Sequence, residues 1–207
     1  KFQRRLKLTW ADGEQKTLYL GSSGGAGATH FRQAGKDEVY ITGDITIWSA
    51  AAQASSYIDT LYFSVPRDTV TSLILENANG TFEFVKDGDT WRYLNLGESE
   101  IFKDGELTTL LTQTTSLRMA APLGKDEKPS YGLGDPQVIL TLQADSDDAQ
   151  HQYELRIGAS IGEHHVAISS DSSYFVSISS YTANSLINKT HRSFLEDLSE
   201  DELETSG

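Results

Sequence analysis

Alternating apolar and polar residues predict β-strands in the first part of the chain. Turn residues at 11–14 join the first two strands into a hairpin, and a glycine-rich loop over 21–27 precedes the next pair. We expect strands over residues 6–10, 16–20, 29–33 and 38–42. The side chain of Asp44 can then accept a hydrogen bond from the first turn of a helix over 45–54. This part is therefore predicted as strands followed by a helix.

The middle of the chain predicts hairpins and a second helix. Asn79-Gly80 is a residue pair that favours a tight hairpin turn, and Asp87-Gly88 provides another turn. We expect strands over residues 70–76, 81–86 and 90–93. From residue 104 to 118, leucines at near-helical spacing form one apolar stripe. Such a stripe is typical of a helix that packs on a sheet.

The last part of the chain returns to strands. Residues 120–135 contain several prolines and glycines and are predicted to form an irregular connector. Further strands are expected over residues 138–143, 153–157, 165–169 and 174–179. A short helix over 182–187 follows, and the acidic, polar tail 199–207 is expected to be disordered.

One pattern occurs twice. Residues 18–23 (LYLGSS) match residues 155–160 (LRIGAS), and the gap-free match continues to residues 39–41 over 176–178. Six of the 25 positions from Thr17 to Ile41 are identical at this spacing of 137 residues. Such self-similarity indicates that a strand, a glycine turn and two more strands are used twice. We expect four apolar side chains of the two copies to be buried: Leu18, Leu20, Leu155 and Ile157.

These patterns predict an α+β fold of mostly antiparallel sheets with a few packed helices. Two related strand-turn-strand-strand-helix lobes would flank a middle hairpin-helix segment. We expect residues 1–198 to form a single unit, with pseudo-repeats at about 6–60 and 137–195 and the middle segment at 70–120.

Net charge and composition exclude some classes of partner and some kinds of chemistry. The net charge of −13 would repel the phosphates of nucleic acid, so nucleic acid is not an expected partner. The chain has no cysteine, which excludes disulfides and thiolate chemistry. It shows no apolar segment long enough to span a membrane. Because it starts at Lys1, we expect that a targeting or anchoring segment preceded it.

The pattern G-x-S-x-G occurs around Ser23 and around Ser160. In a serine hydrolase this pattern exposes the nucleophile on a strand-to-helix turn. Here loop and strand are predicted after each serine, which favours a structural turn whose glycines adopt positive φ. A serine hydrolase using Ser23 or Ser160 is kept as a remote alternative.

Metal and nucleotide sites find little support. His164 and His165 would point to opposite faces of a strand, so they cannot chelate one ion by themselves. The acidic run 145–148 lacks the glycine and the closing glutamate of an EF-hand loop. The glycine-rich loop 22–28 lacks the lysine that would contact a phosphate. We therefore expect no metal and no cofactor.

Aromatic side chains are the remaining candidates for a binding site. Tyr131, Trp91 and Trp48 could stack on a sugar or anchor a protein partner. For each of them burial in the core is the alternative, and Trp91 is the one expected to pack under the second predicted helix. The sequence does not decide between core and site.

The order of these features resembles domain-of-unknown-function family 4340. The most specific piece is Tyr131-Gly132-Leu133-Gly134-Asp135-Pro136 before a strand, and the later Ile157-Gly158 matches the family's layout. The resemblance covers residues 6–195. It implies a bacterial protein held at the outer side of the cytoplasmic membrane by an N-terminal helix, which would precede Lys1. Some members are linked with ABC-type transport or gliding motility.

We therefore expect a non-catalytic, extracytoplasmic accessory or interaction domain of a bacterial envelope protein, with another envelope protein as its partner. The resemblance carries no catalytic residues, so it favours location and architecture over activity. The alternative is a small-ligand or glycan-binding module that uses the exposed aromatic residues. A deep cleft lined by tryptophan or tyrosine would favour that alternative, and a flat patch would favour the interaction domain.

Overall fold

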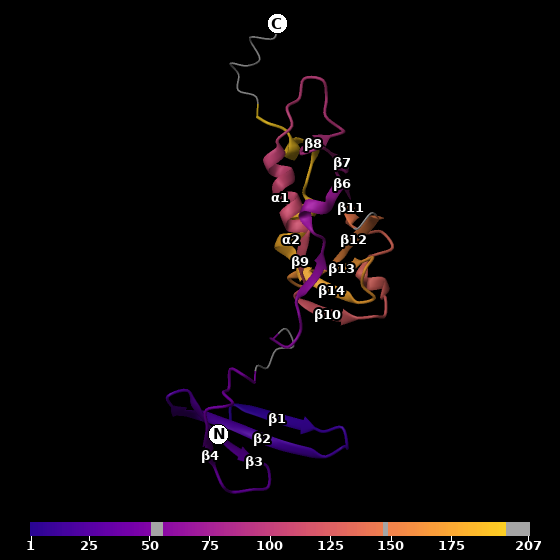
Figure 1. Cartoon of the computed structure of the whole chain (residues 1–207). Coiled ribbons are helices and arrows are strands. Elements are labelled where there is room, and N and C mark those ends of the chain that lie inside the picture. The colour runs from indigo at the N-terminus through magenta and orange to yellow at the C-terminus, as the bar shows by residue number, and fades with distance from the viewer. Residues whose placement is uncertain (51–55, 147–148, 198–207) are drawn as a thin grey trace. The chain divides into compact units, whose positions relative to one another are not determined.

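The computed structural model describes residues 1–50, 56–146 and 149–197. It divides the chain into two compact units, unit 1 (Lys1–Ile58) and unit 2 (Asp59–Gly207). In Figure 1 the colour follows the residue number, so the strands of unit 1 are indigo to purple and those of unit 2 run from purple to orange. The single unit expected over residues 1–198 is thus two units in the structure. The antiparallel α+β architecture expected from the sequence is confirmed.

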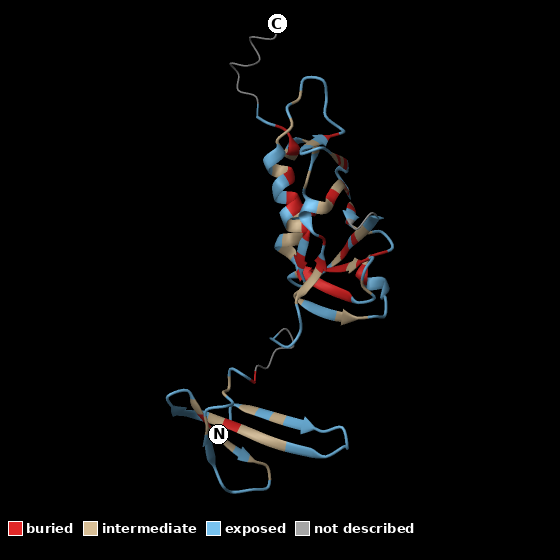
Figure 2. Cartoon of the chain, in the orientation of Figure 1, coloured by how far each residue is buried: buried red, intermediate tan, exposed pale blue. Residues whose placement is uncertain are grey.

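Unit 1 is a four-stranded antiparallel sheet in which neighbours along the chain are also neighbours in space. Its strands are β1 (Arg4–Thr9), β2 (Gln15–Gly25), β3 (Ala28–Gln33) and β4 (Tyr40–Thr42). Few of its side chains are fully buried, among them Leu20 and Thr29 in the sheet. Figure 2 shows this unit mostly in the colours of exposed and intermediate residues. Unit 1 therefore has a small core for a sheet of this size.

The helix expected over 45–54 is not observed in the described part of that range. Residues 47–49 form a turn, in which the Thr46 and Ser49 hydroxyl groups lie 2.8 Å apart and each side chain accepts a hydrogen bond from the other's backbone N–H. Side chains of this kind compete with helical backbone bonds, so they favour turns. Residues 51–55 lie outside the described residues.

Unit 2 is built on an eight-stranded antiparallel sheet of order β10-β14-β13-β12-β11-β6-β7-β8. The strands are β6 (Val70–Asn77), β7 (Gly80–Asp87), β8 (Thr90–Tyr93), β10 (Ala121–Gly124), β11 (Val138–Ser146), β12 (Ala149–Ile161), β13 (His164–Ser169) and β14 (Phe175–Ser179). The middle segment and the second predicted lobe therefore share one sheet, and the expected arrangement of two lobes around a middle segment is not what the structure shows.

The other elements of unit 2 lie outside this sheet. They are the two α-helices α1 (Asp104–Thr114) and α2 (Ser180–Ile187), the strand pair β5 (Leu61–Ser64) and β9 (Ser116–Arg118), and the 3-10 turns η2 (Arg67–Thr69), η3 (Pro129–Tyr131) and η4 (His191–Phe194). The main core packs leucines of α1 and α2 and Phe194 of η4 on the alternating apolar residues of the central strands. Figure 2 shows the buried residues gathered along these strands and helices.

A second, smaller core lies on the other face of the sheet. Val166 and Phe175 belong to it, whereas their neighbours Ala167 and Val176 belong to the main core, because successive residues of a strand point to opposite faces. Tyr131, from the connector, packs against Phe175 with ring centres 5.4 Å apart. Part of the connector, expected to be irregular, forms β10 at the edge of the sheet.

Helix α1 ends earlier than the leucine pattern indicates. The hydroxyl groups of Thr112, Thr114 and Thr115 all donate to backbone carbonyls one turn earlier. Such bonds weaken the preference of threonine for a helix interior. Leu117, the last residue of the stripe, lies in β9, which pairs with β5.

The two sequence-similar segments share local geometry. In each, a bulge places two residues of the first strand opposite one of the next, between Leu20 and Ser23 in β2 and between Ile157 and Ser160 in β12. A glycine with positive φ, Gly25 or Gly162, follows at the same spacing. Strand, glycine turn and two further strands are thus present in both.

Two details of this comparison correct the sequence reading. Positive φ does not occur at Gly21 or Gly158, which lie inside strands. Unit 1 has a second bulge before Gly25, which adds one residue, so Thr42 rather than Ile41 occupies the place of Ile178. A one-residue shift moves a side chain to the other face of a sheet. The gap-free match is therefore out of register by one residue over the last two strands.

Candidate functional site

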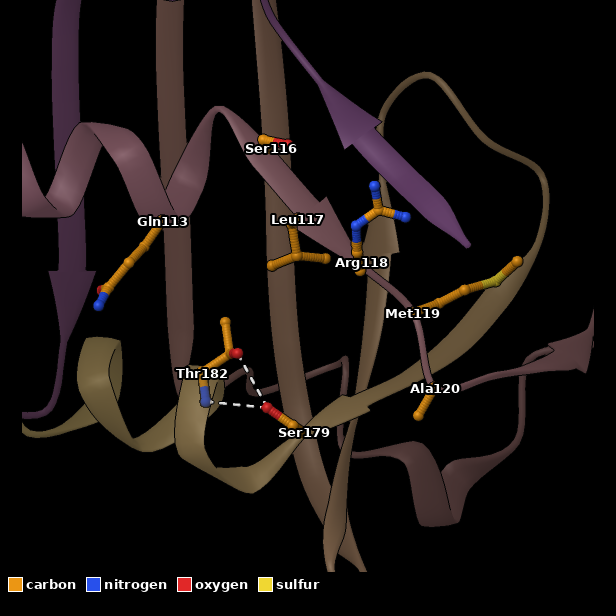
Figure 3. Close-up of a pocket in the computed structure, with 8 residues that line it drawn as sticks. All are labelled: Gln113, Ser116, Leu117, Arg118, Met119, Ala120, Ser179 and Thr182. Atoms are coloured by element: carbon orange, nitrogen blue, oxygen red, sulfur yellow. Dashed lines mark hydrogen bonds between the residues drawn. The ribbon is translucent and has the colours of Figure 1, made fainter. Parts of the chain in front are cut away.

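A pocket of about 390 Å³ lies in unit 2 between the end of α1, β9 and the start of α2 (Figure 3). Eight residues line it: Gln113, Ser116, Leu117, Arg118, Met119, Ala120, Ser179 and Thr182. The Ser179 hydroxyl accepts a hydrogen bond from the Thr182 backbone at 3.1 Å and caps α2. The side-chain amide oxygen of Gln113 accepts a hydrogen bond from the Ser185 hydroxyl, and the Arg118 guanidinium donates one to the Thr60 hydroxyl. These polar groups already serve the fold, so the pocket offers little for catalysis.

A serine and a histidine meet at the start of α2. Ser180 Oγ lies 3.2 Å from Nδ1 of His165, and burial lowers the pKa of this imidazole. However, the backbone N–H of Ser180 donates to Glu163, and that of Thr182 to Ser179, so these donors are not free to hold an oxyanion. Within the described residues no carboxylate bonds to His165. The pair therefore lacks the orienting acid that activates a serine nucleophile.

The two serines of the G-x-S-x-G patterns lie in strands. Ser23 is in β2 and donates to the Ala28 carbonyl of the same hairpin, at 3.5 Å. Ser160 is in β12, and β13 follows it. The strand-to-helix turn that a hydrolase needs is absent at both serines.

Three side chains connect the loop before α1 to η4. His191 Nδ1 lies 2.7 Å from the Tyr93 hydroxyl, and Nε2 lies 2.9 Å from a Glu100 oxygen. Burial, and then the Glu100 charge, raise the pKa of Tyr93 to about 12. The hydrogen bond from the Gly97 backbone, followed by that from His191, lowers the pKa of Glu100. A phenol with this pKa stays protonated at neutral pH and is not a base. The cluster therefore connects three segments of unit 2: β8, the loop before α1 and η4.

The described residues contain no group of three or more His, Cys, Asp or Glu side chains that could hold a metal ion. In the same part of the chain, no helix is long and apolar enough to cross a membrane.

The sheet of unit 1 has one cationic face. Arg5, Tyr19 and Arg32 lie directly opposite one another on β1, β2 and β3, so they project from the same face, and Lys7 follows two residues after Arg5. Four cations lie on or near this face: Lys1, Arg5, Lys7 and Arg32. The structure gives no ion-pair partner for any of them among the described residues. The ion pair described in unit 1 joins Lys16, on the opposite face, to Glu14 at 3.1 Å.

A pocket of about 490 Å³ opens on this face. Phe2, Tyr19, His30 and Arg32 line it, together with residues of the loops beside them. The Phe2 and Tyr19 rings lie 4.8 Å apart, and the Arg32 guanidinium lies 5.6 Å from the centre of the Tyr19 ring. The pocket thus combines aromatic surface with an unpaired cation.

Unit 1 also exposes most of the large apolar side chains. Of the 16 such side chains exposed in the described residues, ten lie among the first 58 residues: Phe2, Leu8, Trp10, Val39, Tyr40, Ile41, Ile45, Trp48, Tyr57 and Ile58. Three of them are consecutive at β4, the edge strand of the sheet. Exposed apolar groups concentrated in one region mark interaction surfaces.

The three aromatic candidates from the sequence have different environments. Tyr131 is 4% exposed and packs in the smaller core, which is the alternative that the sequence left open for it. Trp91 is partly buried against the main core, as the alternative reading expected. Trp48 is 81% exposed and borders a pocket of about 120 Å³ next to Thr29. The structure does not bring these three together in one site.

Sequence reasoning missed Tyr19, Arg32 and the apolar edge at Val39-Tyr40-Ile41. The alternation along β2 and β3 could have indicated Tyr19 and Arg32, because it places both side chains on the face opposite Leu20. The edge position of β4 gave none, because strand order within a sheet is a tertiary property.

A comparison with models of protein families shows which family the chain matches. The model of one family, Domain of unknown function (DUF4340), matches residues 2–136, which covers unit 1 and extends through η3 of unit 2. The match ends before the last strands, so it is shorter than the range expected from the sequence. No curated protein and no solved structure gives a significant match. With well over half of its residues matched, the chain belongs to the DUF4340 family.

Proposed function

We propose that this protein is a non-catalytic interaction module of a bacterial envelope complex, in which unit 1 binds the partner and unit 2 is the stable scaffold. The observation that carries the proposal is the exposed apolar edge of unit 1. Val39 is 61% exposed, Tyr40 is 54% exposed and Ile41 is 60% exposed, with no charged side chain among them.

The two edges of this sheet are unlike each other. On β1, the charged side chains of Arg4, Arg5 and Lys7 occupy the edge strand, and charge of this kind discourages pairing with another chain. Strand β4 carries no charge. An edge strand with free backbone groups and apolar side chains can add a strand from a partner, whose side chains then pack on both faces. The contrast supports β4 as the place of contact.

Unit 2 has the properties of a scaffold. Its main core contains fully buried leucines and phenylalanines from the sheet, both helices and η4. It also carries most of the negative charge: residues 59–207 contain ten Lys and Arg against 25 Asp and Glu, whereas residues 1–58 contain seven against five. A strongly charged surface favours solubility and opposes non-specific association. This supports unit 1 as the binding part.

The proposed location is the outer side of the cytoplasmic membrane. It is supported by the resemblance that led to the family, whose members are typically anchored there. Association with an ABC-type transporter is the more specific form of the same proposal.

Affinity capture from detergent-solubilised membranes of the source organism tests the function. The tagged chain should retain an envelope protein, and Ile41→Asp should lose it, because a carboxylate at the edge opposes burial against a partner. The matched control is Ile161→Asp, at an exposed isoleucine of unit 2. Equal capture by wild type and Ile41→Asp, or capture of no envelope protein, would contradict the proposal.

Protease treatment of intact spheroplasts tests the location. The full-length gene product should be cleaved, whereas a cytoplasmic marker is protected. Protection of the protein until the cells are lysed would exclude the outer side.

A further inference from the structure

The pocket on the cationic face of unit 1 has a second property that partner binding does not require. It joins an aromatic surface, a cation and polar groups within one concavity of about 490 Å³. Small-molecule sites combine a mostly apolar wall with a few convergent polar groups at volumes of this size. Its chemistry therefore indicates a ligand as well as a surface.

Phe2 provides the apolar wall. Its backbone neighbour Gln3 donates a hydrogen bond to the Leu20 carbonyl at 2.7 Å, which extends the pairing of β1 with β2 and holds the preceding residue in place. One side of the Phe2 ring contacts Tyr19, yet the residue is 52% exposed. The exposed side can accept the C–H face of a saturated ring.

The polar groups of the pocket differ in what they bind. Arg32 and Lys1 are cations without an ion-pair partner among the described residues, and Asp37 is a carboxylate that likewise has none there. The guanidinium of Arg32 can hold a carboxylate or phosphate by two parallel hydrogen bonds. Asp37 would repel an anion but accepts hydrogen bonds from hydroxyl groups. A ligand that suits both has one anionic group and several hydroxyls.

His30 adds an acceptor. Its Nδ1 lies 3.1 Å from the Ser22 carbonyl, and a carbonyl can only accept, so Nδ1 carries the proton. In the neutral ring Nε2 is then an acceptor, and no hydrogen bond to it is described in this part of the chain. A ligand hydroxyl can donate to it.

We propose that this pocket binds an anionic saccharide, with its ring on Phe2, its carboxylate or phosphate on Arg32 and Lys1, and its hydroxyls on His30 and Asp37. The charge of unit 1 agrees with this, since its net charge is positive in a chain whose total is −13. Uronic acids and sugar phosphates share this chemistry, and the test separates them.

Gly21 gives a way to close the pocket without changing its charge. It lines the pocket, its φ lies outside the left-handed region, and a Cβ there would be 3.5 Å from the His30 carbonyl oxygen, an ordinary contact. Gly21→Val should therefore fold and fill the floor between Tyr19 and His30.

The test is a nitrogen-15 NMR titration of the full chain with glucuronate, glucose 6-phosphate, glucose and inorganic phosphate, run separately. Amide signals of Tyr19, Gly21, His30 and Arg32 should move with at least one acidic sugar. Glucose and phosphate alone should bind about tenfold more weakly or not at all, because each lacks half of the contacts. The sugar that binds better identifies the anionic group.

Arg32→Gln and Gly21→Val should each weaken binding about tenfold or more, whereas Lys16→Gln, which removes a cation of unit 1 outside the pocket, should not. Unchanged spectra of unit 2 show that the variants are folded. The proposal is overturned by no binding of either acidic sugar, by equal binding of glucose, by phosphate binding as tightly as glucose 6-phosphate, or by unchanged affinity in both pocket variants.

Discussion

The three-stranded segments β2–β4 and β12–β14 have the same order of strand, bulge, glycine turn and strands, but very different burial. In unit 2, Ile157, Val176 and Ile178 are fully buried. In unit 1, Leu20 is buried at the place of Ile157, while Tyr40, at the place of Val176, is 54% exposed. The shared sequence pattern therefore determines local strand geometry, and burial depends on what packs against the sheet.

The packing elements explain the difference. In unit 2, α1, α2 and η4 cover one face of the sheet, and the connector with Tyr131 covers part of the other. Among the described residues of unit 1, Ala50 is the buried apolar residue outside the sheet. The positions that unit 2 uses for its core are thus exposed in unit 1. We propose that they serve there for contact with another molecule.

Removing a buried side chain from the covered segment should have the largest effect. Ile157→Ala should lower the free energy of unfolding of unit 2 by about 2 to 5 kcal/mol, because it loses apolar burial and leaves a cavity. Leu20→Ala should fall at the low end of the same range for unit 1, where fewer side chains surround it. Urea denaturation followed by hydrogen exchange, which reports each unit separately, measures both. Equal losses would contradict the contrast in packing.

The matching glycines should respond in opposite ways. A Cβ at Gly158 would lie 2.1 Å from the Tyr131 carbonyl oxygen, so Gly158→Ala should cost about 3 kcal/mol of unit 2 stability, at the upper end for overpacking. Gly21→Ala has room and should change stability by less than about 1 kcal/mol, or raise it, since alanine has less freedom to lose. Thermal unfolding of the two variants checks this, and a stable Gly158→Ala would show that the close approach is not required.

Acid should weaken unit 2 through Glu100. Its pKa is lowered in the folded state, so its contribution is present above the ordinary value of 4.5 and is lost as the pH falls through the lowered value. Glu100→Gln should therefore reduce stability at neutral pH and flatten the dependence of unit 2 on pH below 4.5. Denaturation curves at several pH values provide the test. An unchanged pH dependence in the variant would show that Glu100 does not cause the loss of stability in acid.

The smallest effect on stability is expected at the exposed edge. Ile41→Asp should change the unfolding of unit 1 by less than about 0.5 kcal/mol, because the side chain is exposed. Denaturation by urea measures this before any binding experiment. A large loss would mean that Ile41 serves the fold of unit 1, and the lost capture by this variant would then carry no information.

Much of the fold could be predicted from the sequence. Alternation and turn residues predicted β1 to β4, β6 to β8 and β11 to β14, most of them within two or three residues of their observed bounds. Strand β2 ends five residues later than expected, and β12 extends four residues further at each end. The leucines at 107, 110 and 111 identified α1, because they face one core. The end of α1 could not be predicted, since Leu117 continues the apolar stripe but pairs as a strand with β5, which is distant in sequence.

The proposed binding surface was harder to predict from the sequence than the fold. Tyr131 and Trp91 are residue types that are common in binding sites. Their exposure, however, depends on the connector and the core that cover them. Trp48 was identified as a candidate and is exposed. The edge at β4 depends on strand order, and the Tyr19 pocket depends on the register of three strands, neither of which a local pattern specifies.

Site-specific photo-crosslinking in cells of the source organism tests the central claim most directly. A photoreactive amino acid would replace Ile41 in unit 1 or Ile161 in unit 2, both exposed isoleucines. The account predicts that position 41 cross-links to one envelope protein and that position 161 does not. Cross-links to the same protein from position 161 alone, or none from position 41, would contradict the assignment of partner binding to unit 1.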